Sequence, residues 1–169
     1  HTGELKQEIR RRIAICHQAF TQHRKLLFQN KAISLPKRVE LFRCLVLSKF
    51  LFATDSWVIA DQRTKHCLHA SILRLYKRLL KIPADARVQD DWVLAQTGLP
   101  SPTELLRVSR LRYLRTLIKA GDVTQPGLLN LDTDWKHLIE DDLWWMFSQL
   151  CNSSPLSPPD QHVAQWLDL

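Results

Sequence analysis

The stretch LFRCLVLSKFLF, residues 41–52, decides the fold. If these residues form a helix, apolar side chains occupy nearly every side of it, and such a helix is normally buried at the centre of a bundle. Lys49 is the exception, because a lysine can bury its stem while its ammonium stays in water. The stretch therefore predicts an all-α helical bundle whose second helix is central and buried.

Amphipathic helices are expected on both sides of this stretch. Residues 5–30 carry an apolar stripe at helical spacing, formed by Ile9, Ile13, Cys16, Phe20 and Leu27. Ser34 is the predicted N-cap of the second helix, and Pro36 falls in its first turn, where a missing N–H costs nothing. Asp61 is the predicted N-cap of a third helix, which Pro83 closes. Its stripe consists of Leu68, Ile72, Leu75, Leu79 and Ile82.

Three more helices are expected before the C-terminal region. A short helix over residues 90–97 ends at Gly98, a good residue for a left-handed C-terminus. Ser101-Pro102-Thr103-Glu104 is a capping box with proline at the first helical position, and it starts a helix that runs to residue 120. Asp132 is the predicted cap of a helix that continues to residue 150.

The C-terminal region differs in composition from the rest of the chain. Gln125-Pro126-Gly127 predicts a turn at the domain boundary, residues 153–159 form a Pro/Ser linker, and residues 161–167 suggest a short final helix. We therefore expect about six to seven helices in two domains, a basic helical domain over residues 1–122 and an acidic, Trp-rich helical tail over residues 123–169.

Charge is distributed unevenly along the chain. The net charge is +7, but residues 1–119 hold 23 Lys and Arg against 9 Asp and Glu, whereas residues 120–169 hold one Lys and 8 acids. Such asymmetry suggests a body that binds a polyanion and carries an acidic appendage. A solvated surface that keeps the protein soluble explains the basic balance equally well.

Basic side chains fall on one face of each of three predicted helices. These candidate nucleic-acid-binding residues are Arg10, Arg11 and Lys25 on the first helix, Arg74, Lys77, Arg78 and Lys81 on the third, and Arg112, Arg115 and Lys119 on the fifth. Each phosphate that such a stripe neutralises adds to the salt dependence of binding. The alternative for each stripe is again an exposed, solvated face.

Residues for catalysis, metal binding or a cofactor are not recognisable. The Asp90-Asp91 and Glu140-Asp141-Asp142 runs lack partner acids in a suitable context, and the second run is expected on a solvated helix face. His66 and His69 share a helix face but lack two further metal ligands. Phosphate-binding loops and nucleophile motifs are also missing. We therefore expect no enzymatic activity, no catalytic residue, no metal and no cofactor.

Cysteine usage and hydropathy suggest the cellular setting. Cys16, Cys44, Cys67 and Cys151 show no CxxC spacing, so we expect free thiols, with Cys16 and Cys44 buried, in a reducing nuclear or organellar compartment. The longest apolar run is interrupted by Lys49 and Asp55, which argues against a transmembrane segment. Because the chain opens without methionine, we expect a fragment or a processed product.

Several segments together resemble a known family. Residues 8–20, EIRRRIAICHQAF, lie close to the pattern E-I-x-x-R-I-x-x-A-x-x-A-F, and residues 51–57, LFATDSW, follow at the spacing of L-Y-G-x-E-x-W. The second motif departs from the pattern at Phe52, Ala53 and Asp55. Further on, residues 97–100 (TGLP) and 110–114 (RLRYL) are similar to the pattern that follows. Over residues 4–120 the chain thus resembles the thumb and post-thumb region of non-LTR (LINE-type) retrotransposon reverse transcriptases.

This resemblance implies a role in binding without catalysis. A thumb grips the template-primer duplex, an A-like RNA·DNA hybrid recognised through shape and phosphates. The paired catalytic aspartates of these polymerases lie in a palm, which this chain does not contain. The resemblance therefore implies a fragment that binds an RNA·DNA hybrid or another nucleic acid.

An alternative hypothesis is a scaffold or interaction subunit that has been recruited into a larger assembly, possibly organellar. The acidic tail matches nothing in the retroelement family, and its Trp144, Trp145 and Trp166 are candidate protein-interaction residues, because aromatic side chains are enriched at interfaces. Trp144 and Trp145 are adjacent, so a single helix face cannot bury both. The partners would then be protein subunits of that assembly.

Overall fold

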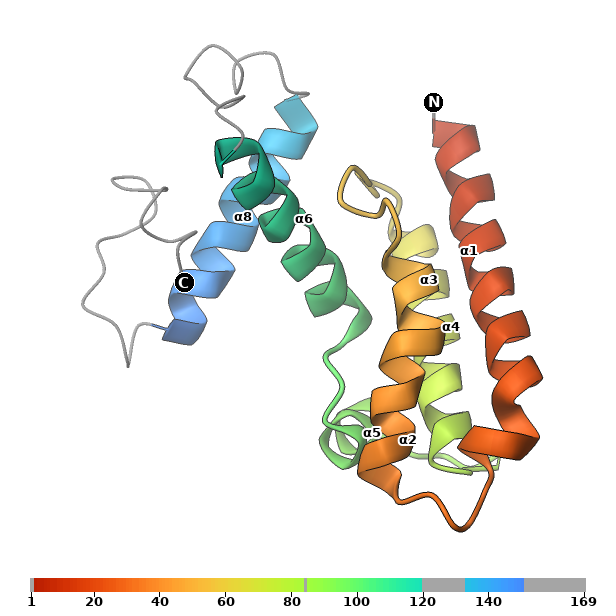
Figure 1. Cartoon of the computed structure of the whole chain (residues 1–169). Coiled ribbons are helices and arrows are strands. Elements are labelled where there is room, and N and C mark those ends of the chain that lie inside the picture. The colour runs from red at the N-terminus through yellow and green to blue at the C-terminus, as the bar shows by residue number, and fades with distance from the viewer. Residues whose placement is uncertain (1, 84, 120–132, 151–169) are drawn as a thin grey trace. The chain divides into compact units, whose positions relative to one another are not determined.

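The computed structural model describes residues 2–83, 85–119 and 133–150, and the predicted all-α fold is confirmed there. These residues form helices and their connections, without a strand (Figure 1). The helices are α1 (Thr2–His23), α2 (Leu35–Phe42), α3 (Ser48–Leu51), α4 (Gln62–Leu79), α5 (Asp90–Thr97), α6 (Pro102–Lys119) and α8 (Thr133–Leu150). Two π-helical turns, η1 (Arg24–Phe28) and η2 (Arg43–Leu47), continue α1 and α2.

The chain divides into two compact units. The first unit comprises His1–Phe52 and Ile59–Leu105, and the second comprises Ala53–Val58 and Leu106–Leu169. The expected domain boundary at residues 122 and 123 lies outside the described residues, as do the linker at 153–159 and the helix at 161–167. Within the second unit, α8 from the acidic region packs against the basic helix α6.

Aromatic rings hold the first unit together. Phe20 of α1 stacks on Phe28 of η1, with the ring centroids 4.8 Å apart. Phe42 of α2 meets both rings edge-on, at 6.1 and 5.9 Å, and also contacts Tyr76 of α4 at 5.7 Å. Because aromatic rings prefer such offset and edge-on contacts, this cluster fixes α1, α2 and α4 against one another.

The predicted central helix is buried on one side only. Phe42, Val46, Leu47 and Phe50 are buried, and this segment packs against α1, as expected for a core element. The opposite side is exposed and carries Arg43, Cys44, Ser48 and Lys49. Phe52 lies just beyond α3 and is 67% exposed. The expectation of burial on nearly all sides was therefore wrong, because these polar residues share one helix face.

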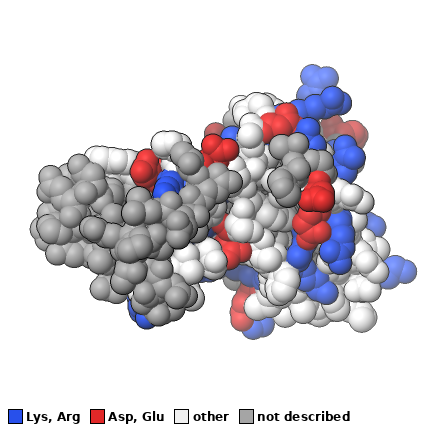
Figure 2. Space-filling model, turned by 90° about the horizontal axis from the view of Figure 1, so that it is seen from above, with Lys and Arg blue, Asp and Glu red and all other residues white. Residues whose placement is uncertain are grey.

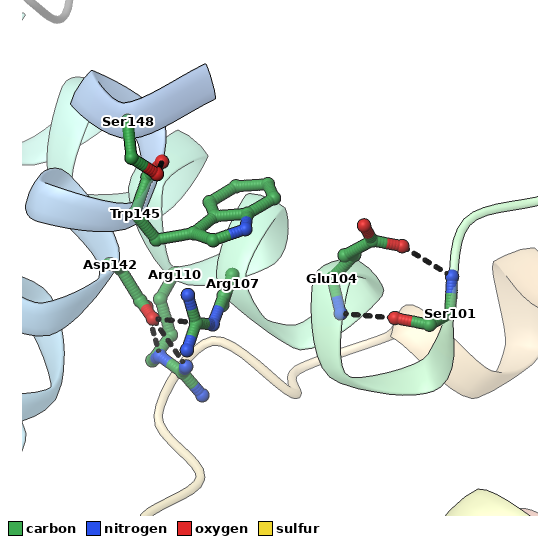
Figure 3. Close-up of polar contacts among 7 residues, drawn as sticks. All are labelled: Ser101, Glu104, Arg107, Arg110, Asp142, Trp145 and Ser148. Atoms are coloured by element: carbon green, nitrogen blue, oxygen red, sulfur yellow. Dashed lines mark hydrogen bonds and ion pairs between the residues drawn. The ribbon is translucent and has the colours of Figure 1, made fainter.

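Local signals placed most helix ends correctly. In the capping box, the Ser101 N–H donates to Glu104 Oε2 at 2.6 Å, and the Glu104 N–H donates to Ser101 Oγ at 3.2 Å (Figure 3). Gly98 ends α5 in the left-handed conformation, with φ +59°. Ser34 occupies the N-cap of α2 as predicted, although its side chain makes no capping hydrogen bond.

A compact apolar cluster forms the core of the second unit. Leu111 and Leu114 of α6 meet Trp135, Ile139 and Leu143 of α8. The Trp135 indole N–H donates to the carbonyl of Asp55 at 3.0 Å, which ties the segment Ala53–Val58 to α8. Asp132, the predicted cap of α8, lies outside the described residues.

The cap of α4 leads to a prediction about acid stability. Asp61 accepts hydrogen bonds from the backbone N–H groups of Arg63 and Thr64. The hydroxyl of Thr64 and then the ammonium of Lys6 lower the pKa of Asp61 from 3.8 to about 2. A depressed carboxyl pKa stabilises the fold above the unfolded-state value, and this contribution is lost as the pH falls through the folded-state value.

Asp61→Ala should therefore flatten the dependence of Tm on pH between pH 3.8 and about 2. The Tm of the wild type should fall further over this interval than the Tm of Asp61→Ala, because only the wild type has the stabilising Asp61 carboxylate. Asp91→Ala, at an exposed position of α5, is the control. Equal acid sensitivity of the wild type and Asp61→Ala would contradict this account of the cap.

Candidate nucleic-acid interface

The basic face of α1 is exposed as predicted, but it is not free of acids. Arg10 and Arg11 of α1 and Lys25 of the following turn η1 are all exposed. Glu8 pairs with Arg11 at 3.2 Å and with Arg12 at 2.6 Å, and these guanidinium groups lower the pKa of Glu8. Arg10 and Lys25 therefore remain the candidates on this face for contact with a phosphate.

The four basic residues predicted for α4 do not form a free stripe. Arg74 is exposed, whereas Lys77 forms an ion pair with Asp90 of α5 at 3.0 Å. Lys81 lies beyond the end of α4 and has a left-handed backbone, with φ +63°. The helix ends at Leu79 rather than at Pro83, so Lys81 does not continue the row. This part of the prediction was wrong.

Arg78 instead turns toward α1. Its guanidinium lies over the ring of Phe20, 4.6 Å from the centroid, and its Nη1 is 3.4 Å from Nδ1 of His17. Burial and the charge of Arg24 lower the pKa of Arg78. Burial, Arg78 and Arg74 lower the pKa of His17. We call His17, Arg24, Arg74 and Arg78 the basic seam.

Ion pairing sets the arginines of the basic seam apart from Arg11 and Lys77, which both pair with a carboxylate. Within the described residues, Arg24, Arg74 and Arg78 form no ion pair with a carboxylate. Asp and Glu lie among the Lys and Arg residues on the face that Figure 2 shows, so a basic composition alone does not identify an anion site. A cluster of cations that repel one another and lack a counter-ion is a more specific sign of an anion site.

A depression of about 370 Å³ adjoins the basic seam on α4. Arg74, Lys77 and Arg78 contribute to its lining, together with Asp90 and apolar residues that include Ile82 and Pro83. The depression is open to solvent and mixes charged with apolar walls. It gives a ligand access to Arg74 and Arg78 from the α4 side.

Sequence reasoning missed His17 and Arg24 of the basic seam. The signal was present, because His17, Phe20 and Arg24 lie about one and two helical turns apart and so share one face of a helix. Arg74 and Arg78 are likewise one turn apart on α4. Only the packing of α1 on α4 brings the two rows together.

The third predicted basic face belongs to the second unit. Arg112 and Lys119 are exposed on α6, whereas Arg115 is partly buried. The Arg115 Nε is buried and has no hydrogen-bond partner among the described residues. Two of the three predicted residues are therefore accessible on this helix.

A buried ion pair in the second unit corrects the interpretation of Glu140-Asp141-Asp142. Glu140 and Asp141 are exposed as expected, but Asp142 is only 1% exposed. Its carboxylate accepts two hydrogen bonds from Arg110, at 2.6 and 2.9 Å, and Arg107 lies 3.6 Å away (Figure 3). Asp142 therefore holds α8 to α6 rather than facing solvent.

Tryptophans of the acidic region have different surroundings. The guanidinium of Arg107 lies 5.3 Å from the ring centroid of Trp145, which is partly buried. Trp144 is 48% exposed and packs edge-on against Phe147. Adjacent positions therefore differ in burial, as predicted, while Trp166 lies outside the described residues.

The burial of one cysteine was misjudged. Cys16 is buried, its thiol contacts the carbonyl of Val46, and burial raises its pKa to about 11. Cys44 is exposed rather than buried.

His66 and His69 belong to no group of three or more possible metal ligands among the residues described. None of the described helices combines the length and hydropathy that a membrane-spanning segment needs.

Comparison with known proteins identifies no relative. No protein-family model, curated protein or solved structure matches the chain. Function is therefore inferred from the residues and their contacts.

Proposed function

We propose that the chain is a non-catalytic nucleic-acid-binding module, whose first unit binds an RNA·DNA hybrid through its phosphates. One observation carries the proposal: Arg24, Arg74 and Arg78 gather in the basic seam, and none of them pairs with a carboxylate of the described residues. Like charges held close together raise the energy of the free protein, and a bound polyanion relieves this repulsion. Arg10 and Lys25 extend the cationic surface along α1 and η1.

The chemistry of the basic seam suits phosphate better than base edges. Guanidinium groups bind phosphate oxygens through paired, charge-assisted hydrogen bonds. Phosphate contacts fix the register of a protein on a duplex without reading its sequence. We therefore expect weak sequence preference and a strong dependence on salt.

The resemblance to LINE-type thumb regions supports the choice of ligand. Such a segment would contact the template-primer duplex and would depend on a separate palm for nucleotide addition. The acidic residues described here support a non-catalytic role, because Asp90 pairs with Lys77 and Asp142 is enclosed by Arg107 and Arg110. A two-metal mechanism requires carboxylates that are clustered and open to the metal ions.

Hybrid binding at several salt concentrations tests this proposal. The log of the association constant should fall linearly with log salt, by about 0.9 per phosphate contacted on a B-form reference, so four to six contacts predict a slope of about −4 to −5. Arg24→Gln combined with Arg74→Gln should make the slope less steep by about 2, because two phosphate contacts are lost. Both side chains are exposed, so this double variant should keep its fold.

A charge-matched control separates the basic seam from net charge. Arg63→Gln combined with Lys65→Gln removes the same charge from exposed positions at the start of α4, and it should leave the slope almost unchanged. Equal effects of the two double variants would show that binding follows net charge alone. Hybrid affinity no greater than that of an unrelated domain of equal charge would reject the proposal.

One observation favours a second candidate function. Trp144 exposes 48% of its surface on α8, next to Phe147. Exposed aromatic side chains are typical anchors of protein interfaces. If the hybrid fails to bind, a scaffold that docks through Trp144 into a larger assembly becomes the better proposal.

A further inference from the structure

His17 is the one member of the basic seam that can change its charge near neutral pH. It is partly buried on α1, and the charges that act on it come from Arg78 and Arg74 of α4. The turns η1 and η2 and helix α3 also pack on α1, and their charged residues, Arg24, Lys25, Arg43 and Lys49, are all basic. Among the described elements that pack on α1, the charged groups around His17 are thus basic.

The contact between His17 and Arg78 defines the protonation state of the imidazole. Arginine can only donate hydrogen bonds, so Nδ1 of His17 must act as the acceptor for Arg78 Nη1 at 3.4 Å. The contact therefore fits a neutral His17 that carries its proton on Nε2. Once His17 is protonated, both groups are donors and neither can satisfy the other.

We propose that the basic seam is a phosphate site that takes up a proton with its ligand. Arg24, Arg74 and Arg78 bind phosphate groups of the ligand, and protonated His17 donates an additional N–H to the phosphate that Arg78 binds. A phosphate oxygen is the acceptor that His17 and Arg78 both lack after protonation. This inference rests on the proposed function in one respect: the bound phosphate belongs to a nucleic-acid backbone.

The direction of the pH effect follows from the surrounding charges. In the free protein, burial and the two arginines keep the pKa of His17 below its ordinary value of 6.5. A bound phosphate offsets this repulsion, so the pKa rises in the complex. The complex then binds more protons than the free protein, and affinity must increase as the pH falls through this range.

The inference is tested by measuring hybrid affinity against pH at constant salt, with hydroxyl-ended strands so that terminal phosphates do not titrate. Wild-type affinity should increase about threefold to tenfold between about pH 7.5 and pH 5.5. His17→Gln should remove this gain. His66→Gln, at an exposed position of α4, should retain it.

An NMR titration of the wild-type imidazole provides a readout that does not depend on a variant or on nucleic acid. Inorganic pyrophosphate should raise the pKa of His17. If the hybrid binds but the wild type and His17→Gln share one pH dependence, the phosphate site is wrong and the proposed function stands. If the hybrid does not bind while pyrophosphate raises the His17 pKa, the phosphate site stands and the nucleic-acid function is wrong. If hybrid affinity does not depend on His17 and pyrophosphate does not raise the His17 pKa, the phosphate site is rejected.

Discussion

Asp142→Ala is expected to lower the free energy of unfolding of the second unit by about 3 to 5 kcal/mol, because it leaves buried cationic charge without its partner. Asp142 is 1% exposed and Arg110 is 7% exposed. Two short hydrogen bonds join them, and the resulting pair links α6 to α8. Urea unfolding followed by tryptophan fluorescence measures the effect, since Trp135, Trp144 and Trp145 lie in this unit.

Two matched variants show whether this cost comes from the buried charge. Asp141→Ala removes a neighbouring exposed carboxylate and should change stability by less than about 0.5 kcal/mol. Arg110→Met combined with Asp142→Leu should recover much of the loss, because replacing both partners of a buried pair with apolar residues is often tolerated. If Asp142→Ala unfolds like the wild type, the ion pair does not hold the unit together.

Phe42→Ala is expected to lower the free energy of unfolding of the first unit by about 3 to 5 kcal/mol, because it leaves a cavity in a packed aromatic core. Phe42 is fully buried and contacts Phe20, Phe28 and Tyr76. Denaturant unfolding followed by circular dichroism measures the loss.

Phe52→Ala provides the matched control for this prediction. It removes the same side chain from the same predicted apolar run, but Phe52 is 67% exposed and its ring contacts Arg12. We expect a loss below about 1 kcal/mol, since an exposed cation–π contact contributes little. Equal losses for the two variants would contradict the one-sided burial of this segment.

Short-range signals predicted the helix ends well. The bonds at Ser101–Glu104, Asp61 and Gly98 all form between residues a few positions apart. Their geometry follows from local backbone conformation and depends little on the rest of the fold. The capping residues could therefore be identified without any knowledge of tertiary packing.

Burial of charged groups depended on pairing that one helix alone does not reveal. Asp142 lies about one turn from Ile139 and two turns from Trp135, so it shares the buried face of α8. Arg110 lies one turn from both Leu106 and Leu114 on the buried face of α6. On its own helix, each charged residue interrupts an apolar stripe. Only the packing of α6 on α8 shows that the two charges neutralise each other.

The basic faces were misjudged for a related reason. Arg78 was assigned to an exposed face of α4, but neighbouring α1 offers it the ring of Phe20. Lys77 was expected to be free, yet α5 brings Asp90 beside it. Helical periodicity gives the direction of a side chain from its own helix, whereas its partners come from elements distant in sequence.

NMR mapping of the hybrid-bound protein tests the central claim most directly. Adding an RNA·DNA hybrid to isotope-labelled protein should produce its largest backbone shift changes in residues 17–24 and 74–78, which carry the basic seam. Arg24→Gln combined with Arg74→Gln should abolish most of these changes, whereas Arg63→Gln combined with Lys65→Gln should preserve them. Shift changes that avoid both segments and gather around Trp144, or no changes at all, would contradict a nucleic-acid interface in the first unit.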